Sequence, residues 1–308
     1  MVTLVRAPNP SAMTLSGTNS YLVDCGGGTA LAIDPGPAIQ SHVENLVETA
    51  RACDLTIRAI ALTHGHPDHA PAARPLASLT GATIYAHPNG VDRDADLPLE
   101  GELRVGEVAL HTIDAPGHTF DHAVFYLPRE RALFTGDVIL GEGTVVIAPP
   151  GGAMRPYQAT LRRLANEFPR ARTIYGGHGP VVENAPAKIA EYIEHRAMRE
   201  RELLAALSRG EKTIPALVLE IYGDSRPILW PAMARQMLAY LLALEAEGRV
   251  RSRRLDRAMS GQERWILNPP LEKIVGTEQA AVIAAELGAQ LHLDDLYSYD
   301  LVGRTNAS

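Results

Sequence analysis

Three histidines and an aspartate lie within one short stretch of the chain, Leu62-Thr63-His64-Gly65-His66-Pro67-Asp68-His69. Imidazole and carboxylate groups are the ligands that zinc takes when no thiolate is available. The stretch follows an apolar run at 57–62, and we expect a helix to begin near Pro67, with Asp68 and His69 on its first turn. His64 and His66 would then point into one space from the loop. The alternative is a polar loop with surface histidines, but a motif of this length favours a metal site.

Two more histidines and an aspartate recur in glycine-bearing loops that follow strand-like runs. They are found in Ala115-Pro116-Gly117-His118-Thr119, in Phe134-Thr135-Gly136-Asp137, and in Tyr175-Gly176-Gly177-His178-Gly179-Pro180. Glycine allows the sharp turn that projects the following side chain from the edge of a sheet. Each loop alone is weak evidence, since a single loop histidine is usually a surface residue. Together with the first stretch, they supply enough ligands for two metal ions.

Strand-like runs and amphipathic helices alternate through the first two-thirds of the chain. Strands are predicted at 21–25, 30–34, 57–62, 83–86, 108–113, 123–127, 132–135 and 173–175. Helices are predicted at 39–53, 68–80, 156–168 and 186–209. The strands are rich in Val, Ile, Tyr and Thr and are bounded by Gly, Pro or Asp. This alternation indicates a layered α/β domain that extends to residue 210.

The pattern changes after Gly210. Helices are predicted at 215–222 and 231–247, and short strands at 249–254 and 264–267. Two short strands after a pair of helices are typical of a winged helix-turn-helix domain, here at 211–267. The remaining residues, 268–308, form a C-terminal extension with a helix expected near 277–287, and the sequence assigns it no role.

The histidine and aspartate motifs resemble those of the metallo-β-lactamase superfamily over roughly residues 15–200, and Asp34 in Ile33-Asp34-Pro35-Gly36 matches another motif of that superfamily. A closer resemblance is to the lactamase-β-like-2 group, in which a winged helix follows the catalytic domain. It rests on Gly17-Thr18-Asn19-Ser20-Tyr21, on Gly117-His118-Thr119-Phe120-Asp121-His122, and on the segments 136–144 and 177–196. This likeness covers about residues 10–267.

The resemblance implies a four-layer αββα sandwich and a binuclear zinc-dependent hydrolase that uses a metal-bound hydroxide. One metal site would comprise His64, His66 and His118. The other would comprise Asp68, His69 and His178, and Asp137 would bridge the two. We expect Asp68 and Asp137 to be catalytic, with Asp68 also carrying a proton. Two Zn²⁺ ions fit the histidine-rich set best, although Mn²⁺ or Fe can occupy mixed histidine–carboxylate sites.

Three further residues are candidates for orienting or assisting these ligands. Asp34 would fix a ligand imidazole, with Thr63, Thr119 and Thr135 behind it; the alternative is a turn carboxylate before Pro35. Asn19 would either donate to a developing oxyanion or cap a turn. His122 would either face the cleft or be a structural histidine, and we favour the structural role.

Composition excludes several classes of protein. Of the 308 residues, 46% are hydrophobic and 21% are charged, which is typical of a folded protein. The only two cysteines, Cys25 and Cys53, allow no cysteine zinc cage. With no signal-like start and no long apolar run, we expect a cytoplasmic protein without a membrane segment. The net charge of −7 argues against a dedicated duplex-DNA binder.

Two substrate classes remain open. The mitochondrial member of the lactamase-β-like-2 group is an endoribonuclease on single-stranded RNA, and an arginine strip could serve that activity here (Arg249, Arg251, Arg253 and Arg254). The alternative is a hydrolase of small thioesters, esters or lactones, with Met154, Tyr157 and Trp230 lining an apolar slot.

Two other functions are less favoured. A true β-lactamase is disfavoured because no signal sequence is evident and the second metal site has aspartate where the familiar subclass has cysteine. A DNA-binding regulator would not need a full set of ligands. The apolar run at 287–296 could pack on a second copy to form a homodimer.

Overall fold

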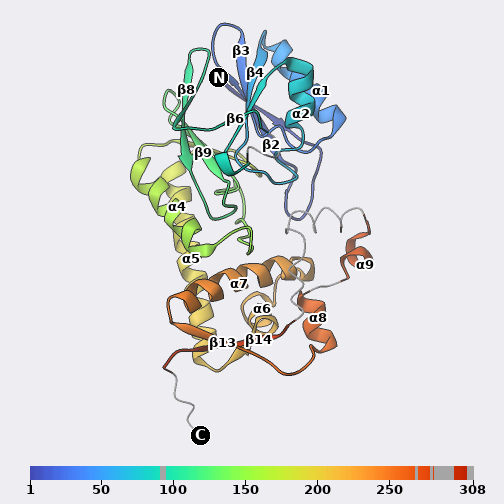
Figure 1. Ribbon diagram of the computed structural model, residues 1–308, viewed down its shortest axis with the longest axis vertical. Coiled ribbons are helices and arrows are strands. Elements are labelled where there is room, and N and C mark those ends of the chain that lie inside the picture. The colour runs from blue at the N-terminus through green and yellow to red at the C-terminus, as the bar shows by residue number, and fades with distance from the viewer. Residues whose placement is uncertain (91–94, 268–269, 278–279, 281–294, 304–308) are drawn as a thin grey trace. The chain divides into compact units, whose positions relative to one another are not determined.

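The computed structural model describes residues 1–90, 95–267, 270–277, 280 and 295–303 (Figure 1). The chain divides into two compact units. The first comprises Met1–Val145 and Ala159–Tyr192, and the second comprises Val146–Gln158 and Ile193–Ser308. Within the described ranges, no helix has both the length and the apolar character needed to cross a lipid bilayer.

Two β-sheets form the centre of the first unit. The six-stranded sheet has the order β1-β2-β3-β4-β5-β6, with strands Val2–Arg6, Asn19–Asp24, Thr29–Ile33, Thr56–Ala61, Thr83–Ala86 and Leu97–Pro98. The five-stranded sheet has the order β11-β10-β9-β8-β7, with strands Thr173–Gly176, Ala132–Gly136, Ala123–Leu127, Val108–Asp114 and Glu102–Val105. Each sheet has a parallel pair of strands that leads into loops with predicted site residues. The pair is β3 with β4 in the six-stranded sheet and β10 with β11 in the five-stranded sheet.

Alternation along the strands separates two apolar cores. On β3, Ala30 and Ala32 pack in one cluster with residues of helices α1 (Gln40–Ala52) and α2 (Ala73–Thr80), which cover the outer face of the six-stranded sheet. Leu31 and Ile33 point the other way, into a cluster that includes Phe125 of the five-stranded sheet. Because successive side chains on a strand face opposite sides, one strand serves both cores. Figure 1 shows α1 and α2 beside the sheet that contains β2 to β4.

Helix α4 (Met154–Glu167) covers the outer face of the five-stranded sheet. The guanidinium of Arg163 donates to the carbonyl oxygen of Asp114 on β8. Just past the helix, the ring of Phe168 packs on Tyr126 of β9 with centroids 4.7 Å apart. A second long helix, α5 (Ala185–Ser208), follows β11. The layer order is therefore helix, sheet, sheet, helix, and the predicted αββα sandwich is confirmed.

The helix predicted at 68–80 begins only at Ala73, so the expectation that Asp68 and His69 lie on its first turn was wrong. Both lie in turns, where the carbonyl oxygen of His66 accepts from the N–H groups of His69 and Ala70. Pro71 explains the delay, because proline has no N–H and disfavours helical geometry in the preceding residue. The sequence also fails to predict the outer strands β1, β6 and β7.

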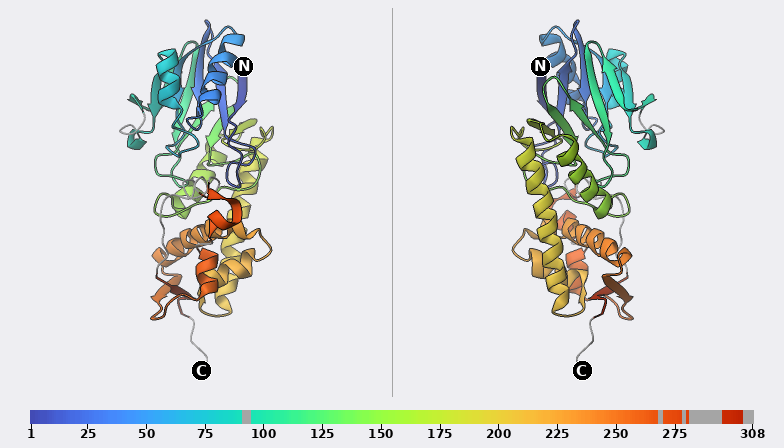
Figure 2. Two further views of the ribbon diagram at one scale, coloured as in Figure 1. Left: turned by 90° about the vertical axis from the view of Figure 1, so that its right-hand side faces the viewer. Right: turned by 90° about the vertical axis from the view of Figure 1, so that its left-hand side faces the viewer.

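The second unit contains helices and a small sheet of order β12-β14-β13 (Figure 2). Its strands are Lys212–Thr213, Tyr297–Leu301 and Val250–Arg254. Its helices are α6 (Ile214–Tyr222), α7 (Trp230–Ala246), α8 (Gly261–Leu267) and α9 (Leu271–Val275). This combination of helices with a small antiparallel sheet agrees with the predicted winged helix.

The strand predicted at 264–267 is wrong, because these residues end helix α8. Ser260 and Glu263 form a reciprocal cap: the N–H of Glu263 donates to Ser260 Oγ, and the N–H of Ser260 donates to Glu263 Oε2. This Ser-x-x-Glu capping box is a helix-start signal that can be read from sequence. The missing strand is β14, contributed by the extension to which the sequence assigned no role. Most of the helix expected near 277–287 and of the run at 287–296 lies outside the described residues.

We predict that β14 is required for the stability of the second unit. It is the central strand, and it places Asp300 beside Arg251 and Ser298 beside Glu211. A chain ending at Asp295 should unfold at a clearly lower temperature in calorimetry, because β12 and β13 then share no neighbour. A chain ending at Gly303 keeps β14 and is the control. Equal melting of the two shortened chains would contradict the prediction.

Candidate metal centre

The predicted ligands come from loops at one end of the two sheets. His64 and His66 follow β4, His118 follows β8, Asp137 follows β10, and His178 follows β11. The carboxyl ends of parallel neighbours meet at a common edge, so β3 with β4 and β10 with β11 deliver their loops to the same place. The structure brings all seven predicted ligands together, in two groups that share Asp137 as a neighbour.

The first group comprises His64, His66 and His118, whose ligand atoms lie within 4.8 Å of one another. His66 Nδ1 and His118 Nε2 are 3.1 Å apart. Burial lowers the pKa of His64 well below its usual value, and burial together with the nearby His118 lowers the pKa of His66 to about 4. Both imidazoles are therefore neutral at pH 7 and present lone pairs, as metal ligation requires.

The second group comprises Asp68, His69 and His178, again with ligand atoms within 4.8 Å. Asp68 Oδ2 lies 3.1 Å from His178 Nε2 and 3.4 Å from His69 Nε2. Burial alone would favour the neutral acid, but the adjacent His69 and the hydrogen bond from His178 hold the pKa of Asp68 below its usual range. Burial opposes charge on His69 as well, yet Asp68 and Asp137 raise its pKa well above the usual value. This half of the site attracts positive charge.

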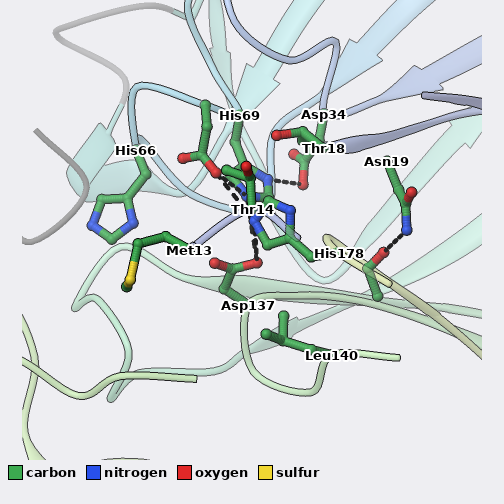
Figure 3. Close-up of polar contacts among 12 residues, drawn as sticks. Met13, Thr14, Thr18, Asn19, Asp34, His66, His69, Asp137, Leu140 and His178 are labelled. Carbon is green, nitrogen blue, oxygen red and sulfur yellow. Dashed lines mark hydrogen bonds and ion pairs between the residues drawn. The ribbon is translucent and has the colours of Figure 1, made fainter. Parts of the chain in front are cut away.

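Asp137 lies between the two groups and turns one oxygen toward each. Its Oδ2 is 3.8 Å from His118 Nε2 in the first group. Its Oδ1 is 3.4 Å from His69 Nε2 and 3.5 Å from His178 Nε2 in the second group. Figure 3 shows Asp137 facing the His69 and His178 rings, with Asp34 on the far side of His69. A carboxylate in this position can contribute an oxygen to each of two sites.

The polar atoms left without partners fit divalent cations. His64 Nε2, His69 Nε2 and Asp137 Oδ1 are buried and accept or donate no hydrogen bond. Buried polar atoms are nearly always satisfied, so three orphans at one point call for an absent ligand. The Nδ1 atom of His64 contacts Thr63, and that of His69 contacts Asp34. This leaves the Nε2 atoms of both rings directed at the cluster. Imidazole and carboxylate donors suit zinc, manganese or iron.

Asp34 contacts two of the predicted ligand histidines, His69 directly and His64 through Thr63. Its Oδ2 lies 2.9 Å from His69 Nδ1 and accepts from the hydroxyl of Thr63, while its Oδ1 accepts from the backbone N–H of Thr63. Thr63 Oγ1 in turn lies 3.0 Å from His64 Nδ1. The Asp34 backbone has a φ of 46°, a left-handed conformation that aspartate tolerates better than most residues. These contacts place Asp34 where it could fix the orientation of both rings.

Asn19 anchors the loop that carries His178. Its side-chain amide donates to the carbonyl oxygens of Gly176 and Gly179, at 3.0 and 2.9 Å. The hydroxyl of Tyr21 donates to the same Gly176 oxygen at 2.7 Å. Both amide hydrogens of Asn19 are thus committed, which leaves none for an oxyanion in this arrangement; Figure 3 shows the side chain directed away from the cluster.

His122 supports Asp137 and His64. Its Nε2 accepts from the backbone N–H of Asp137 at 3.2 Å, and its ring stacks on that of His64 with centroids 4.7 Å apart. Of the three threonines expected behind Asp34, only Thr63 contacts it. Thr135 donates to the carbonyl oxygen of Ile139 and so closes the turn that contains Asp137. Thr119 Oγ1 is buried without a hydrogen-bond partner.

Close packing of two loops allows only glycine at position 177. A Cβ atom there would lie 2.4 Å from Asp137 Oδ1 and 2.6 Å from His69 Cε1. At Gly141 a Cβ would lie 1.9 Å from the carbonyl oxygen of Pro180. The loop after β10 and the loop after β11 therefore interlock, which brings Asp137 and His178 together.

Tyr192 is a contributor that the sequence does not reveal. From α5, its hydroxyl accepts from the N–H of Leu140 at 2.9 Å and donates to the carbonyl oxygen of Gly143 at 3.0 Å. Between these two residues, the N–H of Gly141 donates to the carbonyl oxygen of His178 at 2.8 Å. Tyr192 thus fixes the loop against which His178 rests, and nothing in the spacing of a helical tyrosine signals this.

We predict that Asp34→Asn weakens zinc binding by about 10- to 100-fold, because a carboxamide cannot accept from both Thr63 and His69 in the same way. Competition against a chromophoric chelator measures the affinity. The exposed Asp54→Asn, also at a position of positive φ, is the matched control. An Asp34→Asn protein that binds zinc as the wild type does would contradict the orienting role.

A second prediction concerns Tyr192→Phe, which should weaken zinc binding by about tenfold by releasing the loop against His178. Tyr240→Phe is the control, since Tyr240 is equally buried and donates to the carbonyl oxygen of Arg196 in the second unit. Each substitution should cost about 1 kcal/mol of stability through one lost buried hydroxyl. If both variants changed zinc affinity alike, the positioning role would be refuted.

The chain resembles known proteins along most of its length. A family model for the metallo-beta-lactamase superfamily matches residues 13–178, and one for the beta-lactamase associated winged helix domain matches residues 213–265. A beta-lactamase-like protein 2 homolog of Caenorhabditis elegans is 34% identical over 73% of this chain and 77% of its own. An atrochrysone carboxyl ACP thioesterase of Aspergillus chevalieri is 31% identical over 81% of this chain and 85% of its own.

Solved structures agree on the fold. The crystal structure of a metallo-beta-lactamase family protein from Thermus thermophilus covers 82% of this chain and 95% of its own, with a TM-score of 0.68 at 24% identity. The match of the family model to more than half of the chain, the relatives above 30% identity and the αββα sandwich all agree. The chain belongs to the metallo-beta-lactamase superfamily of hydrolases, in the branch that carries a C-terminal winged helix.

Proposed function

We propose that this protein hydrolyses thioesters of small metabolites with two zinc ions held by the seven clustered ligands. His64, His66 and His118 would hold one ion, Asp68, His69 and His178 the other, and Asp137 would bridge them. The observation that carries the two-ion proposal is that one oxygen of Asp137 faces each group. The thioester class is favoured by the similarity to the Aspergillus chevalieri thioesterase.

Zinc, when bound, would lower the pKa of water toward 7 and polarise the substrate carbonyl. The residues of the chain would supply orientation and proton transfer. Water adds to the carbonyl carbon, the carbon–sulfur bond breaks, and the products are a carboxylate and a thiol. Asp68 would hold the proton that water gives up and pass it to the leaving sulfur, because its carboxylate is held ionised and is still 8% exposed. Asp34 and Thr63 would keep the ligand rings in place throughout.

The arginine strip offers little support for an RNA substrate. Each of its four arginines faces a carboxylate: Arg249 with Glu200, Arg251 with Asp300, Arg253 with Glu211, and Arg254 with Asp295. Binding of single-stranded RNA relies on a positively charged groove, and these pairs neutralise the strip. We therefore place RNA cleavage second to thioester hydrolysis.

The apolar slot suggested by the sequence also needs revision. Met154 and Tyr157 are almost wholly buried in the second unit, where the Arg196 guanidinium lies 5.0 Å from the Tyr157 ring centroid. Side chains packed in this way cannot line an open slot. The acyl group of the substrate must be recognised by other residues.

A substrate panel tests the proposal. Zinc-loaded protein should hydrolyse acyl thioesters and lose that activity on chelation, whereas a labelled oligoribonucleotide, a lactone and a cephalosporin should turn over more slowly. Thioester turnover should change little as salt rises, while cleavage of RNA would fall steeply through counterion release. Faster, salt-sensitive cleavage of the oligoribonucleotide would favour the RNA activity and overturn the thioester proposal.

A further inference from the structure

Three loops that carry clustered residues meet at His122, whose side chain is completely buried. Its ring stacks on that of His64, in the loop after β4, with centroids 4.7 Å apart and 20° between the ring planes. Its Nε2 accepts from the backbone N–H of Asp137, in the loop after β10, at 3.2 Å. Its carbonyl oxygen accepts from the N–H of Ala115 at 2.8 Å and so closes the loop that carries His118. His122 therefore contacts parts of the site that are far apart in the sequence.

The contact with Asp137 bears on the whole cluster, because this residue turns one carboxylate oxygen toward each group of predicted ligands. A Cβ atom on the preceding residue, Gly136, would lie 2.9 Å from His122 Nε2 and 2.4 Å from Thr63 Oγ1. Glycine, here with a φ of 45°, thus allows the imidazole to approach the turn closely. A side chain projects from its backbone, so the hydrogen bond to His122 constrains where the Asp137 carboxylate can point.

Packing alone does not require an imidazole at this position. Nε2 must be the unprotonated nitrogen, because a backbone N–H can only donate. The proton of the neutral ring is then on Nδ1, which is buried and has no hydrogen-bond partner among the described residues. A phenylalanine ring could stack on His64 and would bury no unsatisfied donor. What the imidazole adds is the acceptor for the Asp137 N–H.

We propose that His122 is a positioning residue: by accepting from the Asp137 N–H, it places the Asp137 carboxylate so that both groups bind a metal ion. Without this acceptor the buried N–H would lack a partner, the turn after β10 could rotate, and one oxygen would no longer face each group. The inference rests on the proposed two-ion site. It adds that binding of both ions depends on a residue that is a ligand of neither.

Two substitutions separate the two contacts of the ring. His122→Phe keeps a ring to stack on His64 and removes the acceptor, whereas His122→Gln keeps an acceptor oxygen and removes the aromatic ring. Zinc is titrated into chelator-treated full-length protein in competition with a chromophoric chelator, and elemental analysis counts the ions bound per chain. The wild type should bind two ions. His122→Phe should bind one of them at least about tenfold more weakly, and His122→Gln should recover much of that affinity.

The same substitutions at His111 are the matched controls. His111 is an exposed histidine of β8 that contacts Glu102 and Tyr126 rather than any clustered residue. His111→Phe and His111→Gln should bind zinc as the wild type does, which excludes a general effect of losing one imidazole. Thermal unfolding of the metal-free proteins shows whether each variant is folded.

A purely structural role predicts the opposite order of affinities, because Phe fills the buried space and keeps the stacked ring while Gln does neither. Equal zinc affinities of the two His122 variants, or wild-type binding by His122→Phe, would overturn the proposal. If His122→Phe does not fold, His122→Gln still decides, since loss of an ion from that folded variant would also contradict the proposal. A wild type that binds one ion would instead overturn the two-ion function. The two variants would then be compared at that ion, because Asp137 faces either group.

Discussion

The buried carboxylate of Asp34 is the interaction on which the site depends. It joins the end of β3 to the loop after β4, and through Thr63 and His69 it fixes two rings that belong to different halves of the cluster. Burying a carboxyl group this deep is costly unless each oxygen is hydrogen-bonded, and here each one is. The hydrogen bonds that offset the cost of burying it form only when the end of β3 and the loop after β4 lie side by side. Formation of this part of the site is therefore coupled to formation of the six-stranded sheet.

Asn19 and Tyr192 fix the loops that follow strands β11 and β10 of the five-stranded sheet. One belongs to β2 and the other to α5, and both bond to the backbone of loops that carry the clustered residues rather than to those side chains themselves. Loop backbone normally satisfies its polar groups with water, which leaves it mobile. Here buried side chains, instead of water, satisfy the polar groups of the loop backbone. The geometry of the cluster is held from both sandwich layers and does not rely on the ligands alone.

The sequence was sufficient for the layered α/β fold and for the seven clustered residues, because strand periodicity and the glycine-bearing loops are local signals. It was not sufficient where a distant partner decides the outcome. The strand Tyr297–Leu301 needs β12 and β13 on either side, and neither is visible in its own pattern. Pro71 delays the helix predicted at 68–80 until Ala73, and helix α8 begins at a Ser260–Glu263 cap that is itself visible in the sequence. The role of Tyr192 becomes evident only through the loop backbone that surrounds its hydroxyl.

The interlocked loops around Gly141 and Gly177 restrict how this scaffold can diversify. Where the backbone of one loop touches the backbone of the next, side chains cannot be exchanged to suit a new substrate. Sequence changes that alter the substrate must then lie in segments whose conformation is fixed by hydrogen bonds within the segment. The stretch between β1 and β2 is one, since Asn9 and Ser11 bond to Thr14 and Thr18 within it. Because Gly17 and Thr18 of this segment lie against His178, a replacement that keeps these two positions can change the rest of the segment while the clustered residues stay where they are.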